Sequence, residues 1–336
     1  MGRYYCGEEQ RLLPTCNYWG ARLDSDTNFK SKYMRNIQGI FVTTLLTVTL
    51  AYSALGQGCS DAGFCTINSL QPNHSDTTAP TKNQCMLGLS VGGADHDIVI
   101  WSNLLEYRRQ INDRLGMGLK VTTLAQSGNN IMAFGASDVF LDAHYRLGKK
   151  VKLTLGAKIP LTNGNSTQDN LALPMDYQSS LGTFDLIVGF GYSIQRLQLI
   201  AAIQQPITQN KNRFLAEEYP TDPIRGFQST NKFTRSGDVL LRISYPVSLG
   251  QKWKITPSIL PIYHLKNDQF TDFIGKNVAI QGSQGLTLNA NAYVDYEINR
   301  QNALQLSFGM PLLVRDARPD GLTRSFLVSV EYGIKF

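Results

Sequence analysis

The end of the chain decides the fold, and it reads Ser325-Phe326-Leu327-Val328-Ser329-Val330-Glu331-Tyr332-Gly333-Ile334-Lys335-Phe336. Large apolar side chains occupy every second position from Phe326 to Phe336. Successive side chains of a strand point to opposite faces, whereas a helix would scatter these residues around its circumference. The stretch is therefore predicted to be a β-strand with one apolar face.

The same alternation recurs from Cys85 onward, in runs longer than the 5–6 residues or so of an ordinary soluble strand. Turn residues separate the runs. We predict about twelve strands, over residues 85–93, 98–110, 114–126, 136–147, 150–161, 184–195, 196–206, 237–248, 251–265, 285–298, 302–314 and 324–336.

A soluble β-sandwich would also alternate, but two further features favour a membrane barrel. The first is that aromatic residues gather near predicted strand ends, as in the interfacial girdles of such barrels. These aromatics are Tyr145, Tyr192, Tyr245, Trp253, Tyr296 and Phe336. The second is that tight and long connections alternate along the chain, which a sandwich does not require.

The tight turns are predicted at Asn112-Asp113, Gly148-Lys149, Gln195-Arg196, 248–251 and 299–301. Long loops are predicted at 127–135, 162–183, 207–236, 266–284 and 315–323. Short periplasmic turns opposite long extracellular loops are typical of outer-membrane barrels. We therefore expect an all-β fold over residues 85–336, a transmembrane antiparallel up-and-down β-barrel.

The N-terminal part has the pattern of an exported protein. Met34-Arg35-Asn36 is followed by an apolar run over 40–51 and by Ala54-Leu55-Gly56, which is the layout of a cleaved secretory signal peptide over 34–56. Residues 1–33 precede this signal, so we interpret them as a misannotated extension with Met34 as the true start. The expected location is the outer membrane of a Gram-negative bacterium.

Composition excludes other partners. The chain has 336 residues, of which 42% are hydrophobic and 17% charged, with a net charge of +6. No Lys/Arg cluster interleaved with aromatics accompanies that charge, so a nucleic-acid partner is not expected.

Three cysteines follow the signal peptide. Cys59 and Cys65 bracket a short loop and are expected to form a disulfide, which an exported protein permits. Cys85 is then free or a competing partner, and a lipid anchor on Cys59 is the other alternative. Residues 57–84 form a periplasmic segment, either a loose tail or a small plug in the barrel mouth.

Two segments of the sequence resemble known families of barrel proteins. The ending with Tyr332, Ile334 and Phe336 resembles the C-terminal signal recognised by the barrel-assembly machinery. The hairpin over 135–162, with Asp138, Tyr145-Arg146-Leu147 and Ile159-Pro160-Leu161, resembles the barrels associated with meta-pathway phenol degradation. Those barrels are distant relatives of the long-chain fatty-acid transporters, and the resemblance implies an uptake channel for small solutes, including hydrophobic ones.

The polar faces of the strands predict what lines the lumen. Both signs of charge occur in similar number, so a strongly ion-selective porin is not expected. Two interpretations stay open: an ion-pair network that fills the barrel, or a water-filled constriction. The predicted lining is Asp138, Asp142, His144, Arg146, Lys152, Lys158, Asp185, Asp238, Arg242, Lys254, His264, Asp295, Glu297, Glu331 and Lys335.

Catalysis is not expected. Asp142 and His144 could join a serine as in a barrel lipase or deacylase, but a plain lumen wall also produces same-face neighbours on one strand. The four histidines lack metal-ligand spacing, and no cofactor motif is present, so we expect no metal site and no cofactor.

The expected function is passive uptake of a small solute, hydrophobic or aromatic solutes among them, through an outer-membrane channel. The partners would be the solute, outer-membrane lipid and the barrel-assembly machinery. The alternative is a non-conducting structural or adhesive barrel that acts through loops 162–183 and 207–236.

Overall fold

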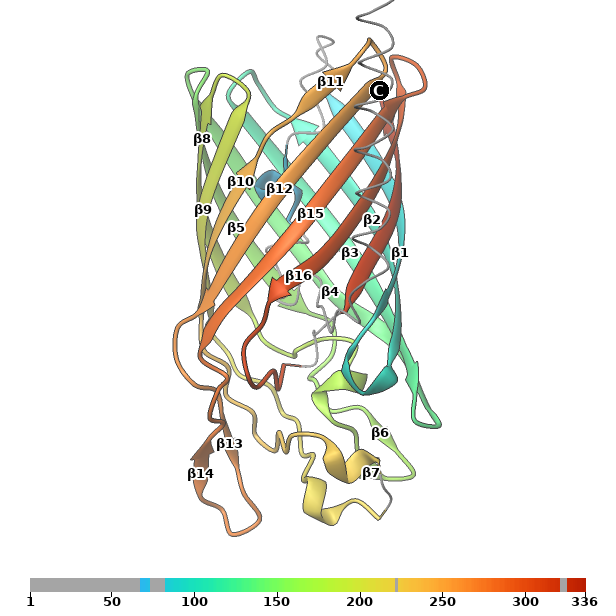
Figure 1. Cartoon of the computed structure of the whole chain (residues 1–336), viewed down its shortest axis with the longest axis vertical. Helices are drawn as coiled ribbons and strands as arrows, with labels where there is room; N and C mark the ends of the chain where they lie inside the picture. Colours follow the sequence, from blue (N-terminus) through green and yellow to red (C-terminus); the bar gives the residue numbers. More distant parts are fainter. Residues whose placement is uncertain (1–66, 73–81, 221–222, 321–324) are drawn as a thin grey trace, which may run out of the picture. The chain divides into compact units, whose positions relative to one another are not determined.

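The computed structural model describes residues 67–72, 82–220, 223–320 and 325–336, and these form a closed antiparallel β-barrel (Figure 1). The expected extension (1–33), the signal peptide (34–56) and the Cys59–Cys65 disulfide lie outside the described residues. So does most of segment 57–84. Cys85 is a free thiol.

Twelve positions around the wall are filled, with β10 and β11 sharing one of them. The wall consists of β1 (Asn83–Gly93), β2 (Val99–Gln110), β3 (Leu115–Gly128), β4 (Ile131–Leu147), β5 (Val151–Pro160), β8 (Asp185–Ile194), β9 (Leu197–Pro206), β10 (Asp238–Ser244), β11 (Val247–Leu249), β12 (Trp253–His264), β15 (Gly285–Glu297), β16 (Asn302–Leu313) and β17 (Phe326–Lys335).

The first and last strands close the sheet. β1 pairs with β2 on one side and with β17 on the other, in a register that runs from Gln84 opposite Lys335 to Gly93 opposite Phe326. β10 likewise pairs with both β9 and β12. Among the described residues these pairings close the sheet on itself, and closure is the condition for a sheet to cross a bilayer.

The side chains alternate as the period-two pattern predicts. On β8, Leu186, Val188 and Phe190 point outward with 42–53% of their surface exposed. Asp185, just before them, and Ile187, between the first two, are fully buried. The outer face of the barrel is therefore apolar, as the lipid-facing surface of a transmembrane barrel must be. Within the described residues, no helix is long and apolar enough to cross a membrane.

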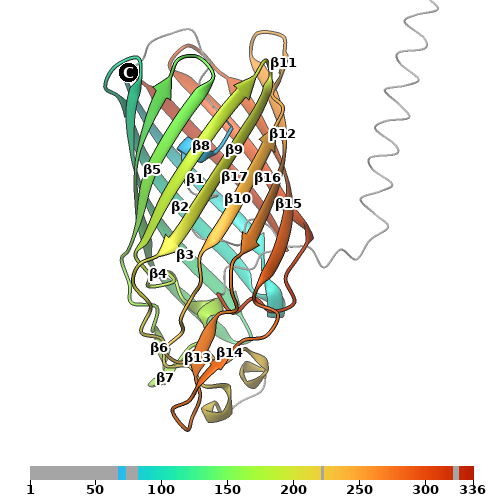
Figure 2. The ribbon, with the colours of Figure 1, turned by 90° about the vertical axis from the view of Figure 1, so that its left-hand side faces the viewer.

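The two ends of the barrel differ. Tight connections at 111–114, 148–150, 195–196, 250–252 and 298–301 lie at one end, here named the turn end, together with the C-terminus (Figures 1 and 2). Loops 161–184, 207–237, 265–284 and 314–325 lie at the other, named the loop end. Loop-end elements are η2 (Asp95–Asp97), β6 (Thr167–Gln168), β7 (Leu171–Ala172), η3 (Met175–Tyr177), η4 (Ala216–Glu218), η5 (Ile224–Gly226), β13 (Gln269–Thr271) and β14 (Asn277–Ala279).

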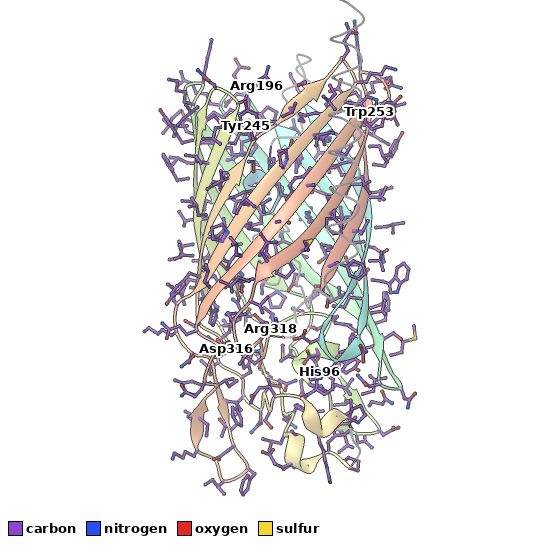
Figure 3. All side chains as sticks on the ribbon, viewed as in Figure 1. His96, Arg196, Tyr245, Trp253, Asp316 and Arg318 are labelled. Carbon is purple, nitrogen blue, oxygen red and sulfur yellow. The ribbon has the colours of Figure 1, made fainter. Side chains whose placement is uncertain are left out.

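Aromatic residues mark the turn end of the outer face. Figure 3 shows Tyr245 and Trp253 there, and they are 47% and 48% exposed. The ring of Trp253 lies 4.4 Å from that of Tyr296, centroid to centroid. The position and exposure of these rings match the interfacial girdle expected of a membrane barrel.

Two sequence predictions need correction. Residues 127–135 are not a long loop: β3 and β4 continue to a two-residue turn at Asn129 and Asn130, whose φ angles of 52° and 61° are left-handed. Asparagine tolerates this conformation, so the pair makes a tight hairpin turn. The predicted strand 237–248 is interrupted after Ser244, next to Pro246, because proline has no N–H to donate to the sheet.

The assignment of side chains of β5 to the lipid-facing side can be tested by introducing a charge at two depths in the membrane. Leu155→Arg places a charge on the lipid-facing side at mid-strand, where Leu155 is 61% exposed, and should lower the free energy of unfolding by about 2–4 kcal/mol. Leu161→Arg, just past the end of the same strand, should cost about 0–1 kcal/mol. Urea unfolding of the two variants in lipid vesicles measures the difference, and equal costs would contradict the assigned faces.

Candidate functional site

The described lumen is closed at the loop end by part of loop 161–184. Ser180 donates a hydrogen bond to the carboxylate of Asp138 on β4 (2.7 Å), and Lys158 on β5 donates to the hydroxyl of Thr183 (3.0 Å). Asp138 and Lys158 point into the barrel, so the loop residues that contact them lie inside it. Ser180 and Thr183 are almost completely buried.

Lys158 also forms a buried ion pair with Asp185 at the start of β8, at 2.9 Å. Gln204 on β9 donates a further hydrogen bond to the same carboxylate. Both charged side chains are inaccessible to solvent, so each depends on the other for the stabilisation that water would otherwise provide.

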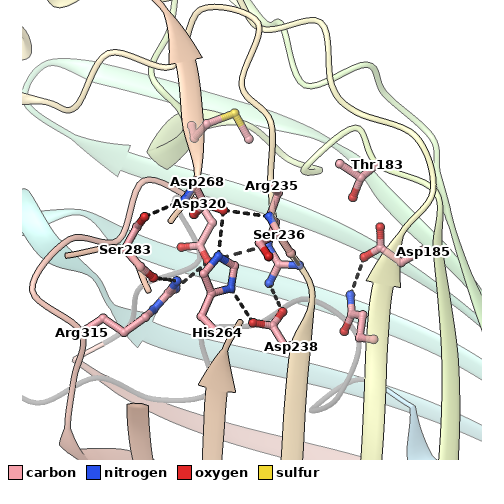
Figure 4. A network of polar contacts seen from close by, with 12 residues as sticks. Thr183, Asp185, Arg235, Ser236, Asp238, His264, Asp268, Ser283, Arg315 and Asp320 are labelled. Carbon is pink, nitrogen blue, oxygen red and sulfur yellow. Dashed lines mark hydrogen bonds and ion pairs between the residues drawn. The ribbon is translucent and has the colours of Figure 1, made fainter. Parts of the chain in front are cut away.

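A second polar network surrounds His264 at the end of β12 (Figure 4). Its Nδ1 lies 2.6 Å from a carboxylate oxygen of Asp238, and its Nε2 lies 2.8 Å from one of Asp268. Only the imidazolium form donates from both ring nitrogens, so the two carboxylates favour a charged His264.

The network continues through two arginines to the neighbouring loops. Arg235 pairs with Asp238, and Arg315 pairs with Asp320 at 2.9 Å. Arg315 also donates to the backbone carbonyl of Ser283 (2.8 Å). The contacts join the start of β10, the end of β12 and loops 265–284 and 314–325, so they fasten the loops over the barrel end.

An apolar cluster covers the loop end beside this network. It packs loop side chains against the ends of β2, β3 and β4. The rings of Tyr177 and Phe227 lie within it, tilted at 44° to each other with their centroids 5.8 Å apart. Its buried members are Ile98, Ile100, Leu124, Ile131, Leu173, Tyr177, Phe214, Tyr219, Ile224 and Phe227. The long loops are thus part of a packed cap.

The middle of the lumen is apolar, and the segment 67–72 lies in it. Figures 1 and 2 both show η1 (Asn68–Leu70) inside the barrel. Ile67 and Leu70 are 1% exposed and pack among inward side chains of five wall strands. The apolar layer consists of Ile67, Leu70, Phe140, Ile187, Ile200, Ala202, Leu240, Leu260 and Ile262. We name residues 67–72 the plug segment.

Two glycines make room for the plug segment. A Cβ added to Gly156 on β5 would lie 2.9 Å from the Ile67 side chain, and one on Gly189 of β8 would lie 2.5 Å from Leu70. Both distances are shorter than carbon atoms tolerate. The wall therefore has a shallow recess that matches these two plug residues.

Toward the turn end the lumen opens into a polar vestibule with a volume of about 300 Å³. Its lining includes Lys254 and Asp295, which form an ion pair at 3.5 Å, and also Glu297, Glu331 and Lys335. Charges of both signs face this space, as a water-accessible entrance requires.

The predicted site residues fall into three groups by burial. Arg146 is exposed next to the turn 148–150. Half-buried are Asp142, His144, Lys152, Lys254 and Glu297. Buried are Asp138, Lys158, Asp185, Asp238, Arg242, His264, Asp295, Glu331 and Lys335. The structure brings together Lys158 with Asp185, Asp238 with His264, and Lys254 with Asp295.

Asp142 and His144 lie over glycines of the neighbouring strand. A Cβ at Gly118 would lie 2.5 Å from Asp142, and one at Gly116 would lie 2.4 Å from the His144 ring. The two side chains therefore fill space along the wall. In the described part of the chain, no group of three or more His, Cys, Asp and Glu residues is arranged to hold a metal ion.

Several buried charged residues were absent from the predicted lining. Glu106 on β2 pairs with Arg108 (2.6 Å) and Lys120 (3.5 Å), and strand parity with Ile98 and Ile100 was a usable signal for it. Arg235, Asp268, Arg315 and Asp320 lie in or beside loops, where no periodicity indicates which side chains turn inward.

The ion pair of Lys158 and Asp185 can be tested by a double-mutant cycle. Lys158→Met leaves a buried carboxylate without its cation and should cost about 3–5 kcal/mol of unfolding free energy. Adding Asp185→Leu removes the stranded charge and should recover most of that loss. Unfolding in lipid vesicles measures all four proteins, and purely additive costs would show that the pair is not coupled.

Asp176 in η3 predicts a pH dependence of the loop-end cap. Burial raises the pKa of its carboxyl from 3.8 to about 7, so between pH 4 and 7 the docked loop binds more protons than the undocked loop. The stability of loop 161–184 should therefore fall as pH rises through this window. Hydrogen exchange of the loop at pH 5 and pH 8 measures the effect, which Asp176→Asn should abolish and Asp169→Asn, at an exposed aspartate of the same loop, should not.

Comparisons with known proteins give structural likeness alone. No family model matches the chain, and no curated protein matches it. Similar solved structures include the TodX deltaS2S3 mutant monoaromatic hydrocarbon channel (13% identity, 85% of this chain and 99% of that one, TM-score 0.42) and the Ralstonia pickettii toluene transporter TbuX (11%, 77% and 90%, 0.38). Another is the translocator domain of the autotransporter NalP from Neisseria meningitidis (10%, 78% and 90%, 0.41). The activities in these names belong to those proteins.

Proposed function

We propose that the chain is an outer-membrane channel for small solutes whose pore is closed at rest by the plug segment and the loop-end cap. The observation that carries the proposal is the insertion of Ile67 and Leu70 into the apolar layer at mid-lumen. The segment that carries them precedes β1 and pairs with no strand of the barrel among the described residues.

The outer surface supports the location. Its exposed side chains are apolar from strand to strand, and aromatic rings gather at the turn end. The turn end would face the periplasm and the loop end the exterior, which is the usual orientation of such barrels. A periplasmic N-terminal segment could then reach the lumen from the turn end.

The construction of the plug supports a gating role. A side chain of the wall cannot leave the lumen without unfolding a strand, whereas η1 contacts the wall through side chains that a solute can replace. The glycine recess at Gly156 and Gly189 accommodates it without strain. On the periplasmic side, the polar vestibule is a space in which a displaced plug segment and an entering solute would both be hydrated.

The apolar layer indicates the solutes. A pore whose centre is lined by Phe140, Ile187, Leu240, Leu260 and comparable side chains favours solutes with an apolar body, hydrophobic and aromatic compounds included. With the plug segment displaced, water would fill the lumen and carry ions through it, but only a solute with an apolar body would gain contacts with this layer. Passive entry down a concentration gradient is sufficient for this function.

The C-terminal residues support assembly by the outer-membrane machinery. Tyr332, Ile334 and Phe336 lie on the outer face and are 37%, 41% and 60% exposed. An exposed apolar stripe on the last strand is available to a protein partner before lipid covers it.

The proposal predicts that the barrel conducts once both closures are removed. Leu70→Lys puts an ammonium group into the apolar layer, where its burial is unfavourable, and should expel the plug segment. The cap can be opened by replacing residues 164–181 and residues 213–231 with two glycines each. Gly182 lies against the backbone of Asn163 at the stem of the first loop, and Lys232 N–H donates to Asn212 C=O across the stem of the second (2.8 Å). We expect discrete current steps in a planar bilayer from the chain with both changes.

The matched control is Leu70→Met, which keeps an apolar side chain of similar volume and should leave the plug in place. With the same loop replacements it should conduct less than the Leu70→Lys chain. A doubly modified barrel that folds and stays silent would reject the channel and favour the non-conducting structural barrel.

A further inference from the structure

Arg242 on β10 is a buried cation without a carboxylate partner. Its side chain is inaccessible to solvent, and the hydroxyl of Tyr293 on β15 accepts its one hydrogen bond within the described chain, at 2.5 Å. Its guanidinium carbon lies 6.0 Å from the centre of the same ring. The Nε and Nη2 atoms are buried and make no hydrogen bond to any residue that the structure describes.

Other buried cations of the barrel have a carboxylate. Lys120 has Glu106, Lys158 has Asp185, Arg235 has Asp238 and Arg315 has Asp320. A buried charge without such a partner is strongly unfavourable, and structural arginines are accordingly paired. Arg242 is therefore poorly explained as a structural residue.

The unused atoms of Arg242 have a specific geometry. Nε–H and Nη2–H lie on one edge of the guanidinium and point in parallel, and this edge binds the two oxygens of a carboxylate. Tyr293 occupies the other side through Nη1 and so holds the guanidinium in place. Thr256 on β12, the register partner of Tyr293, adds a buried hydroxyl with no hydrogen-bond partner.

Arg242 lies at the boundary between two environments. Leu240, two residues earlier on the same face of β10, belongs to the apolar layer, and so does Ile200, the register partner of Arg242 on β9. Toward the turn end, Lys254 and Asp295 line the vestibule, each two residues beyond Thr256 and Tyr293 on the same faces. A solute that enters from the vestibule meets Arg242 before it meets the layer that Ile67 and Leu70 now fill.

We propose that Arg242 binds the carboxylate of the solute, so that the channel selects small organic acids with an apolar body. This inference rests on the proposed function and names its substrate class. The carboxylate pairs with Nε and Nη2 while the body replaces Ile67 and Leu70 in the apolar layer. The plug segment thus occupies the position of the solute body and leaves the cation unpaired.

The leucine side chain of the plug segment suggests a probe for this site. The acid 4-methylpentanoate carries the branched alkyl group of a leucine on a carboxylate, and 4-methylpentanamide is its uncharged counterpart. Titration of the full chain carrying Leu70→Lys, in detergent micelles, measures binding of each compound. We expect the acid to bind and the amide to bind at least tenfold more weakly, because the amide lacks the charge-assisted hydrogen bonds.

Two further variants assign the effect to the residue. Added to Leu70→Lys, Arg242→Gln should weaken binding of the acid about tenfold or more. Arg196→Gln removes the same charge from the exposed turn 195–196 and should leave binding unchanged. Heat-modified mobility on a gel verifies that each variant folds. Equal affinity for the acid in the Arg242→Gln chain, or equal affinity for acid and amide, would overturn the proposal.

The conducting chain, with its loops shortened, provides a second readout, which is the reversal potential of its current. In a tenfold KCl gradient its reversal potential should show a preference for chloride that Arg242→Gln reduces and Arg196→Gln does not. Current without any dependence on Arg242 would retain the channel and reject the anion site. Binding that depends on Arg242 in a silent barrel would retain the site and reject the channel, and a silent barrel that binds nothing would reject both.

Discussion

Every strand of this barrel depends on the pairing of β1 with β17. A bilayer offers no water to an unpaired N–H or C=O group, so a sheet with one open edge would leave a row of unsatisfied groups in lipid. The antiparallel register from Gln84–Lys335 to Gly93–Phe326 removes that edge. Once the sheet is closed, period-two alternation assigns each side chain to lipid or to the lumen, and the interior has to be filled or hydrated.

The interior is filled in three layers, and each meets a different physical demand. At the loop end, buried charges are neutralised in pairs and networks centred on Asp185 and His264. The middle is apolar and includes residues from outside the wall. The turn end is a charged vestibule. The sequence of polar, apolar and polar layers along one axis is what a selective path requires, because each layer admits a different part of a solute.

Much of the wall could be predicted from the sequence, and the reason is local. Alternation in segments such as 184–195 and 324–336 depends only on the two faces of a strand, and the predicted bounds lie within two residues of the observed ones. The tight turn at Asn129 and Asn130 was not predicted, because the apolar alternation is weaker around Gly128 and Gly135. The end of β10 at Ser244 has a local cause, because Pro246 has no N–H to donate to the sheet, but the apolar alternation continues past it and concealed the break.

The interior was less predictable, again for a physical reason. Parity correctly indicates that Lys158 and Asp185 point the same way, but their contact depends on the stagger between β5 and β8. Arg235 and Asp320 are buried through loops whose course no period describes. Arg242 looks like any other inward charge in the sequence, and only its lack of a carboxylate in three dimensions distinguishes it from Lys158.

The position of the plug segment in the chain has a consequence for folding. Residues 67–72 come before β1, and the seam that closes the barrel joins the first strand to the last, so this contact has nearly the largest sequence separation the barrel allows. Contacts between distant residues form slowly. The N-terminal segment therefore meets a half-formed, open sheet for much of the folding time and can settle against Gly156 and Gly189 before the seam forms. The barrel would then assemble around the plug segment, and folding itself would produce the closed state.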